Sequence, residues 1–296
     1  MKLIALILGL GLEHLATQLL HLRELRWFDP YFDIGVRGIK HLDRWAVYAG
    51  SIGVLILPLI PVLWASTVLR GTTIPWDLPY LLFAVLVVFF CLGPRDLGSE
   101  VEEYCEAVGR GDTEQAKRVL VELSEVEHSH ASEIDAVEEA IFVQATNRIF
   151  GVVFWFIVLG PVGAWLFRVS DLLRRRVAFV VGREPDDAEV ILPAVEAIHG
   201  VLVWVPARLA TLGYALSGHF DDAFNCWRSY ELRSELPFHR SNDEIVACVG
   251  KAAMALPREE TPDSAVAAQS AMRLVRRNVF FWVTVIAVMT IFGWAV

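Results

Sequence analysis

Four long stretches of this 296-residue sequence contain no charged side chain: 45–69, 78–93, 149–167 and 278–296. Soluble proteins spread their apolar residues through a core, whereas runs of about 20 apolar residues match the thickness of a bilayer when helical. Strands are excluded for these runs because unpaired backbone groups are not tolerated in lipid. The sequence therefore predicts an all-α polytopic membrane protein with about four full transmembrane helices.

Catalytic motifs are also missing. The sequence has no phosphate-binding loop, nucleophile elbow, zinc-helix motif or dinucleotide fingerprint, and it gives no sign of a cofactor. Its four cysteines show no paired spacing, which argues against a metal site or a disulfide framework and predicts reduced thiols. His128 and His130 could bind a metal, but such neighbours are more typical of a polar loop.

Basic residues are scarce between Asp96 and Glu139, where 14 acidic residues accompany three basic ones. This imbalance argues against nucleic acid or anionic lipid as a partner of the region. Apolar residues recur there at helical spacing, and Asp112 and Ser132 are typical first residues of helices. We therefore expect amphipathic helices with a solvated acidic face, the last of which leads into the membrane.

Residues 2–22 form an apolar run interrupted by Glu13. A signal peptide is the alternative to a retained helix, but no small-residue cleavage site follows the run. The link after it carries five basic residues between Arg23 and Arg44, whereas the link 70–76 carries one. The positive-inside rule then predicts a multi-pass protein of the bacterial inner membrane, with its charged regions facing the cytoplasm.

Two apolar segments contain helix-breaking residues. Segment 149–167 includes Gly160-Pro161-Val162-Gly163, and segment 190–216 includes Pro206. Each segment either crosses fully or is an interrupted, re-entrant helix, and broken helices at membrane depth line protein-enclosed cavities. We expect one integrated domain made of five parts, 1–94, 95–147, 148–217, 218–277 and 278–296. The ligand site is expected in the third part, 148–217.

Ionisable side chains at membrane depth are costly, and they are usually paired or functional. The candidates are Glu13, Arg148, Arg168, Glu196 and Arg208. Arg148 and Arg168 flank an apolar run, so snorkelling towards the interface is a sufficient explanation for them. Arg208 lies inside an apolar run, and we expect it to form an ion pair with Glu196 or Glu13 or to bind an anion through its planar donors.

Several motifs in order resemble the AmpE family. They are Asn147-Arg148-Ile149-Phe150, Leu159-Gly160-Pro161-x-Gly163 and Trp204-x-Pro206-Ala207-Arg208. The resemblance covers essentially the whole chain, and it implies an inner-membrane regulatory protein of the β-lactamase induction system.

The AmpE family in turn resembles the CobD/CbiB membrane synthases of cobalamin assembly. The positions of that family's acidic motifs are occupied here by neutral residues, namely Val143, Gln144, Asn147, His199, Gly200 and Val203. ATP-dependent amide formation needs carboxylates that hold magnesium, so these replacements argue against that activity.

Two functions follow as hypotheses. The first is a regulatory membrane protein that modulates the cell-wall-stress response by binding a partner protein or an anionic molecule such as a muropeptide or a nucleotide. The alternative is a membrane enzyme that uses ATP, with magnesium, or a phosphate substrate. The expected partners include the lipid bilayer and a second copy in a homodimer, but no nucleic acid. The predicted ligand site comprises Arg208, Arg168, Asn147, Arg148, Glu196, His199, Trp204 and Glu13.

Overall fold

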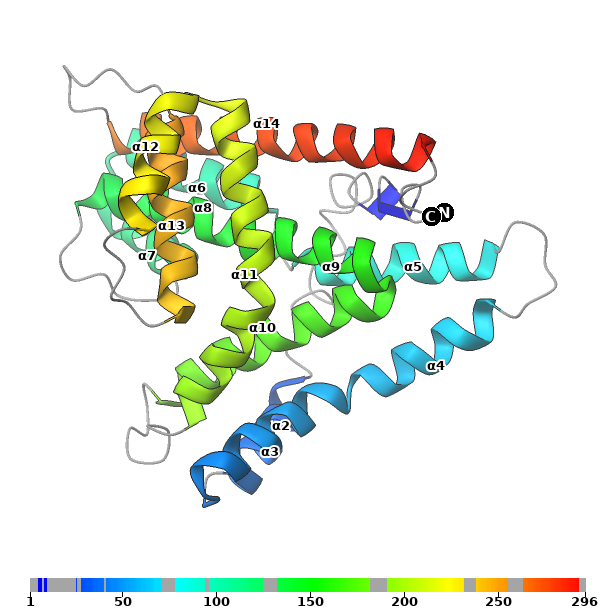
Figure 1. Cartoon of the computed structure of the whole chain (residues 1–296). Helices are drawn as coiled ribbons and strands as arrows, with labels where there is room; N and C mark the ends of the chain where they lie inside the picture. The colour runs from blue at the N-terminus through cyan, green and yellow to red at the C-terminus, as the bar shows by residue number, and fades with distance from the viewer. Residues whose placement is uncertain are drawn as a thin grey trace. The chain divides into compact units, whose positions relative to one another are not determined.

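The structure is a computed structural model of the chain (Figure 1). It describes residues 5–6, 8–9, 25, 28–39, 41–70, 78–93, 96–124, 132–181, 191–231, 238–254 and 263–292. Within these ranges the regular structure is entirely helical, which confirms the predicted fold class. Of the first helix predicted over 2–22, the structure describes only residues 5–6 and 8–9, which are helical. Glu13 and the pair His128 and His130 lie outside the described residues.

Among the described residues, 4 helices are long and apolar enough to cross a membrane. They are Arg44–Arg70, which joins α3 (Arg44–Ile56) to α4 (Leu59–Arg70); Glu133–Leu159; α11 (Ile191–Ser217); and α14 (Ser264–Ile291). A shorter apolar helix, α5, covers Leu78–Cys91. In Arg44–Arg70 only 11% of the apolar window is buried within the protein, so its side chains are left to face lipid.

The chain packs as two compact units, each built from separate stretches of sequence. The first unit contains Met1–Pro94, Gly151–Leu202 and Ala295–Val296, and the second contains Arg95–Phe150 and Val203–Trp294. Both polar regions expected from the sequence, 95–147 and 218–277, belong to the second unit.

Helix α10 (Pro161–Val181) is the central element of the first unit, where it packs on α2 (Asp29–Ile39), α3, α4, α5 and α9 (Gly151–Leu159). The chain turns at Gly160, whose φ of 69° is in the left-handed region that favours glycine. A Cβ atom on Gly163 would lie 2.2 Å from the backbone oxygen of Trp155, so glycine allows α9 and α10 to pack closely. The interruption predicted at 160–163 is therefore the turn of a helical hairpin (Figure 1).

The turn of this hairpin lies beside the last residue of α4 and the first turn of α5. Arg70, the last residue of α4, donates a hydrogen bond to the Tyr80 hydroxyl of α5 over 2.6 Å, and that hydroxyl lies 3.3 Å from the Cβ position of Gly160. At the far end of α10, Arg176 donates to Asp33 of α2 over 2.7 Å. Helix α10 thus runs from the Gly160 turn, beside Arg70 and Tyr80, back to α2, as expected of a re-entrant segment.

This geometry predicts a membrane topology. Single cysteines at position 160 and within 71–77 should react with a membrane-impermeant reagent from one side of the membrane. Cysteines at position 41 and just after position 181 should react from the other side. Labelling of intact and permeabilised cells measures this, and reaction of positions 160 and 181 from the same side would contradict the hairpin.

Helix α11 corrects the expectation of a broken second segment, because it continues without a break from Ile191 to Ser217 with Pro206 inside it. Proline lacks the N–H that would bond the carbonyl four residues earlier, which is that of Leu202. The Trp155 indole of α9 donates to the Leu202 oxygen over 2.9 Å and takes over this role. Only the backbone hydrogen bonding of α11 is interrupted at Pro206.

In the second unit, α8 (Glu133–Ala145) packs against four other helices, α6 (Leu97–Gly109), α7 (Thr113–Ser124), α13 (Phe238–Ala253) and α14. The predicted helix starts are confirmed, because Asp112 Oδ1 accepts the Gln115 N–H over 3.0 Å and Ser132 Oγ accepts the Asp135 N–H over 3.2 Å. The π-helical turn η4 (Thr146–Phe150) continues α8.

The prediction of reduced cysteines is wrong for one pair, since a disulfide joins Cys226 of α12 (Phe220–Glu231) to Cys248 of α13. Helices α12 and α13 pack against each other and bring together two cysteines that are 22 residues apart, with their Cα atoms 6.3 Å apart. Only the helix pairing reveals this proximity. Cys91 and Cys105 are free thiols.

Candidate functional site

The predicted site residues belong to different units of the fold. Arg168, Glu196 and His199 lie in the first unit. Asn147, Arg148, Trp204 and Arg208 lie in the second.

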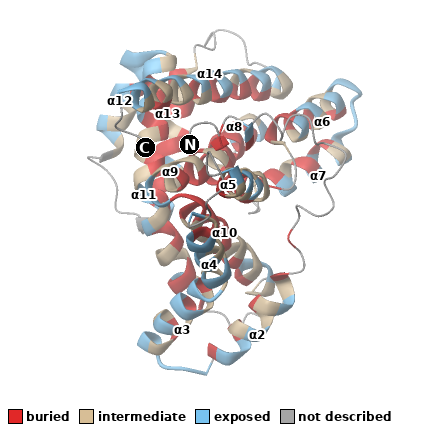
Figure 2. Ribbon diagram, turned by 90° about the vertical axis from the view of Figure 1, so that its right-hand side faces the viewer, coloured by how far each residue is buried: buried red, intermediate tan, exposed pale blue. Residues whose placement is uncertain are grey.

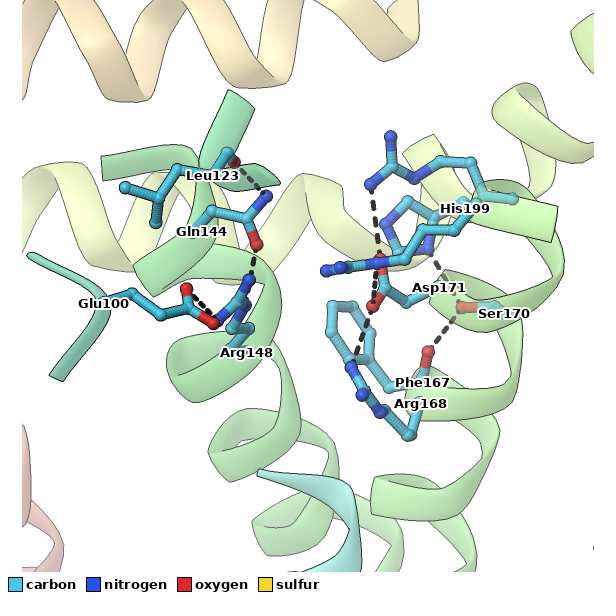
Figure 3. A network of polar contacts seen from close by, with 11 residues as sticks. Glu100, Leu123, Gln144, Arg148, Phe167, Arg168, Ser170, Asp171 and His199 are labelled. Atoms are coloured by element: carbon cyan, nitrogen blue, oxygen red, sulfur yellow. Dashed lines mark hydrogen bonds and ion pairs between the residues drawn. The ribbon is translucent and has the colours of Figure 1, made fainter. Parts of the chain in front are cut away.

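The first unit contains a buried cluster of charged residues on α10 (Figure 3). The Asp171 carboxylate is completely buried, and it accepts from Arg168 over 3.0 Å, Arg174 over 3.3 Å and Arg175 over 3.0 Å. Arg168 is also buried, with 1% of its surface exposed. A fully buried carboxylate shared by three guanidinium groups of its own helix compensates charges that would otherwise be costly to bury.

His199 of α11 lies beside this cluster, with its Nδ1 atom 3.0 Å from Ser170 Oγ (Figure 3). Because Ser170 donates its own hydroxyl proton to the Phe167 oxygen over 2.7 Å, its Oγ accepts a proton from His199 Nδ1. With its proton on Nδ1, a neutral His199 ring would have Nε2 as an acceptor. Nε2 is buried and has no hydrogen-bond partner among the residues that the structure describes.

Asp171 and Ser170 were not predicted from the sequence. A signal for Asp171 was present, because Arg168, Arg174 and Arg175 lie three residues before and three and four residues after it, which is the spacing of neighbours on a helix. The carboxylate of Asp171 stands between Arg168 and the three adjacent arginines 174–176.

Arg176, the next arginine on α10, forms an accessible ion pair with Asp33 of α2, and both side chains are about a quarter exposed. The hydrogen bond from Arg176 holds the pKa of the Asp33 carboxyl below its usual range, although partial burial opposes this shift. Exposed pairs of this kind contribute little to stability, so this pair is a natural control for Asp171.

In the second unit, Arg148 is buried, with 5% of its surface exposed. Its NH1 group lies 2.8 Å from Glu100 Oε2 of α6, and its Nε–H donates to Gln144 Oε1 over 2.9 Å (Figure 3). Gln144 in turn donates to the Leu123 oxygen near the end of α7 over 2.8 Å. Snorkelling is therefore wrong for Arg148, as it is for the buried Arg168, and the Arg148 contacts connect η4 to α6 and α8.

Asn147 lies in η4 and is 2% exposed. Its Oδ1 atom is buried and has no hydrogen-bond partner within the described part of the chain. Single π-helical turns within α-helices occur frequently at functional sites, so the position of Asn147 agrees with its predicted role without testing it.

Arg208 is half-buried on α11, and its guanidinium carbon lies 5.0 Å from the ring centroid of Trp204. Its NH1 group donates to Asn242 Oδ1 of α13, a residue that is 1% exposed. Glu196 is twelve residues earlier on the same continuous helix, or about 18 Å along its axis. The predicted ion pair between Glu196 and Arg208 is therefore out of reach, and the contacts described for Arg208 are with an amide and an indole ring.

The sequence matches the family described as "Regulatory signalling modulator protein AmpE" over residues 1–296. It is 24% identical over 273 residues to Protein AmpE of Shigella flexneri, and these aligned residues make up 90% of each chain.

Two proteins named "Cobalamin biosynthesis protein CobD" are also similar. The protein of Stutzerimonas stutzeri (strain A1501) is 30% identical over 177 residues, which are 59% of this chain and 55% of that one. The protein of Chromobacterium violaceum is 28% identical over 184 residues, 61% of this chain and 55% of that one. The chain thus spans about half the length of these relatives, and no solved structure matches it. Since the match to the regulatory family is complete and the similarity to the CobD proteins is partial, the chain belongs to the AmpE family of membrane proteins.

Proposed function

We propose that this protein modulates the cell-wall-stress response that induces β-lactamase, and that it does so by binding an anionic molecule through Arg208. The regulatory role is supported by the AmpE family description. In the proposed topology the protein lies in the inner membrane, with the basic residues of 23–44 and the end of α10 facing the cytoplasm.

The observation that carries the proposal is the environment of the Arg208 guanidinium. The buried amide of Asn242 and the indole of Trp204 fix its position, and the side chain is only half-buried. A guanidinium has five donors in a planar fork that matches carboxylate and phosphate oxygens. An arginine whose orientation is already fixed loses less conformational entropy when it binds such a group.

The test replaces Arg208 and measures β-lactamase induction in cells that lack the native protein. We expect Arg208→Ala to abolish β-lactamase induction. The amount of the variant protein in the membrane, measured by immunoblot, should stay normal. Arg208→Lys keeps the charge but not the planar fork, and it should retain a fraction of the response.

Arg110→Ala is the matched control, because it removes an exposed guanidinium from the turn between α6 and α7. It should behave like the wild type. A full response from Arg208→Ala at normal protein levels would contradict the proposal.

The similarity to the CobD proteins favours a second candidate, a membrane enzyme that uses ATP or a phosphate substrate. Binding of ATP with magnesium to the purified protein, lost in Asn147→Ala, would support this function. We rank it second because neutral residues occupy the positions where that family has acidic motifs.

A further inference from the structure

Three arginines and several large apolar residues share one face of helix α14, which we name the α14 exposed face. At about 100° of rotation per residue, its members lie within an arc of about 120° around the helix. All of them are exposed, and they are Arg273, Arg276, Arg277, Phe280, Val288 and Ile291. The exposed fractions of the three apolar members are 73%, 47% and 81%.

The opposite face of α14 packs within the second unit. It carries Ala268, Ala271 and Asn278, which are completely buried, and α14 packs on α6, α8 and α13. Figure 2 shows buried and exposed residues along the same helix, and Figure 1 shows the C-terminal half of α14 extending beyond α6 and α13. Within the described part of the chain, the exposed face is therefore a continuous surface of one unbroken helix.

The charge of the three arginines is not compensated by the protein. Helix α14 has no acidic residue, and none of its arginines forms an ion pair with a carboxylate among the described residues. Arg273 donates to the Ser270 hydroxyl of its own helix over 2.8 Å. The NH2 group of Arg276 lies 2.9 Å from the Cβ position of Gly98 at the start of α6, and Asp96 Oδ2 lies 3.1 Å from that position. Three guanidinium groups thus form an exposed basic patch beside one carboxylate.

The apolar part of the face begins where the arginines end. No charge follows Arg277 in the sequence, and α14 is long and apolar enough to cross a membrane. Phe280 and Ile291 are about 16 Å apart along the axis, close to the roughly 15 Å of hydrocarbon in one leaflet. Thr284, which lies between them on this face, donates its hydroxyl to the Phe280 oxygen over 2.8 Å and so offers lipid no unpaired donor.

The direction of the side chains separates the two parts further. Cα–Cβ bonds of a helix tilt towards its N-terminus, so the arginine side chains lean away from the apolar run. Long basic side chains in this position extend their charge to the headgroups. The face therefore presents positive charge at headgroup depth and apolar side chains along the acyl chains of the same leaflet.

We propose that the α14 exposed face binds an anionic phospholipid, with the lipid phosphate on Arg273, Arg276 and Arg277 and an acyl chain along the row from Phe280 to Ile291. Guanidinium groups match phosphate oxygens, and basic clusters next to a membrane helix attract anionic lipids. A free anion would use only the arginines and a partner helix only the apolar row, whereas a phospholipid uses both. This site is separate from Arg208 and does not depend on its ligand.

The first experiment measures lipid retained by the full-length protein from vesicles of equal phosphatidylglycerol and phosphatidylcholine, by native mass spectrometry. We expect at least threefold more phosphatidylglycerol than phosphatidylcholine on the wild type. The triple variant Arg273→Gln, Arg276→Gln and Arg277→Gln should retain at least fivefold less phosphatidylglycerol. Its thermal melt should match the wild type, because the changed side chains are exposed.

The matched control changes Arg110, Arg118 and Arg228 to glutamine, which removes three other exposed guanidinium groups from the second unit. It should retain phosphatidylglycerol like the wild type. An equal loss in both triple variants, or no loss in the first, would overturn the inference. Displacement of the lipid by excess inorganic phosphate would also overturn it, because the ligand would then be a free anion.

A second measurement tests the apolar part of the face with a photo-crosslinking amino acid at position 280 or position 64 in cell membranes. Trp64 is 68% exposed on α4, in the other unit. The anionic fraction of the lipid adducts, identified by mass, should be at least threefold higher at position 280. Adducts to another protein at position 280, or the same lipid composition at both positions, would overturn the inference.

Discussion

Asp171→Asn is expected to destabilise the protein more than any other conservative change at a charged residue described here. The side chain keeps its size but loses the charge that compensates Arg168, Arg174 and Arg175. Removing one partner of a buried ion pair costs about 3–5 kcal/mol, because the remaining charge is left buried. We expect the purified variant to unfold about 10 °C below the wild type in a thermal melt in detergent.

The control for this change is Asp33→Asn. Asp33 also pairs with an α10 arginine, over 2.7 Å, but both partners are about a quarter exposed. Such a pair contributes about 0–1 kcal/mol, so the melt should shift by no more than about 3 °C. Equal melting of Asp171→Asn and the wild type would show that the buried cluster does not stabilise the first unit.

Trp155→Phe should lower stability because it leaves the Leu202 carbonyl without the indole donor. An unsatisfied buried acceptor costs about 1–3 kcal/mol, and because Leu202 is only half-buried the loss should lie at the lower end of this range. In Pro206→Ala the backbone at position 206 regains an N–H that reaches the same carbonyl. The stability loss caused by Trp155→Phe should therefore be at most half as large in the Pro206→Ala background as in the wild type. Thermal melts of the two single variants and the double variant measure this coupling.

Trp64→Phe is the matched control, because Trp64 is 68% exposed on α4. It should melt within about 2 °C of the wild type, as exposed substitutions usually do. If Trp155→Phe lowers the melting temperature equally with and without Pro206, the indole does not substitute for the backbone N–H that proline lacks.

The sequence predicts those features that depend on local composition. The charge-free run 45–69 identifies the candidate membrane helix Arg44–Arg70, and the run 278–296 identifies the apolar part of α14, because lipid admits few alternatives. Asp112 and Ser132 mark helix starts because a cap acts on its own first turn. The turn at Gly160 was also predictable from its glycines and proline. In contrast, Pro206 suggested a broken helix, and only the tertiary contact with Trp155 explains why α11 continues.

The candidate site was predicted less completely for a related reason. Arg148 and Arg168 resemble snorkelling residues in the sequence, since nothing local shows that Glu100, 48 residues away, pairs with Arg148. The disulfide between Cys226 and Cys248 depends in the same way on the pairing of α12 with α13. Asp171 is different, because its three arginine partners lie on the same helix and its role could have been read from their spacing.

The most direct test of the central claim, that the Arg208 guanidinium holds an anionic molecule, is a comparison of ligand binding by purified wild type and Arg208→Ala. Muropeptide, inorganic phosphate and phosphatidylglycerol are titrated separately into each protein. The account predicts that at least one of these anions binds the wild type and binds Arg208→Ala at least tenfold more weakly, with equal thermal stability of the two proteins. Equal affinity of both proteins for every anion that binds would contradict it.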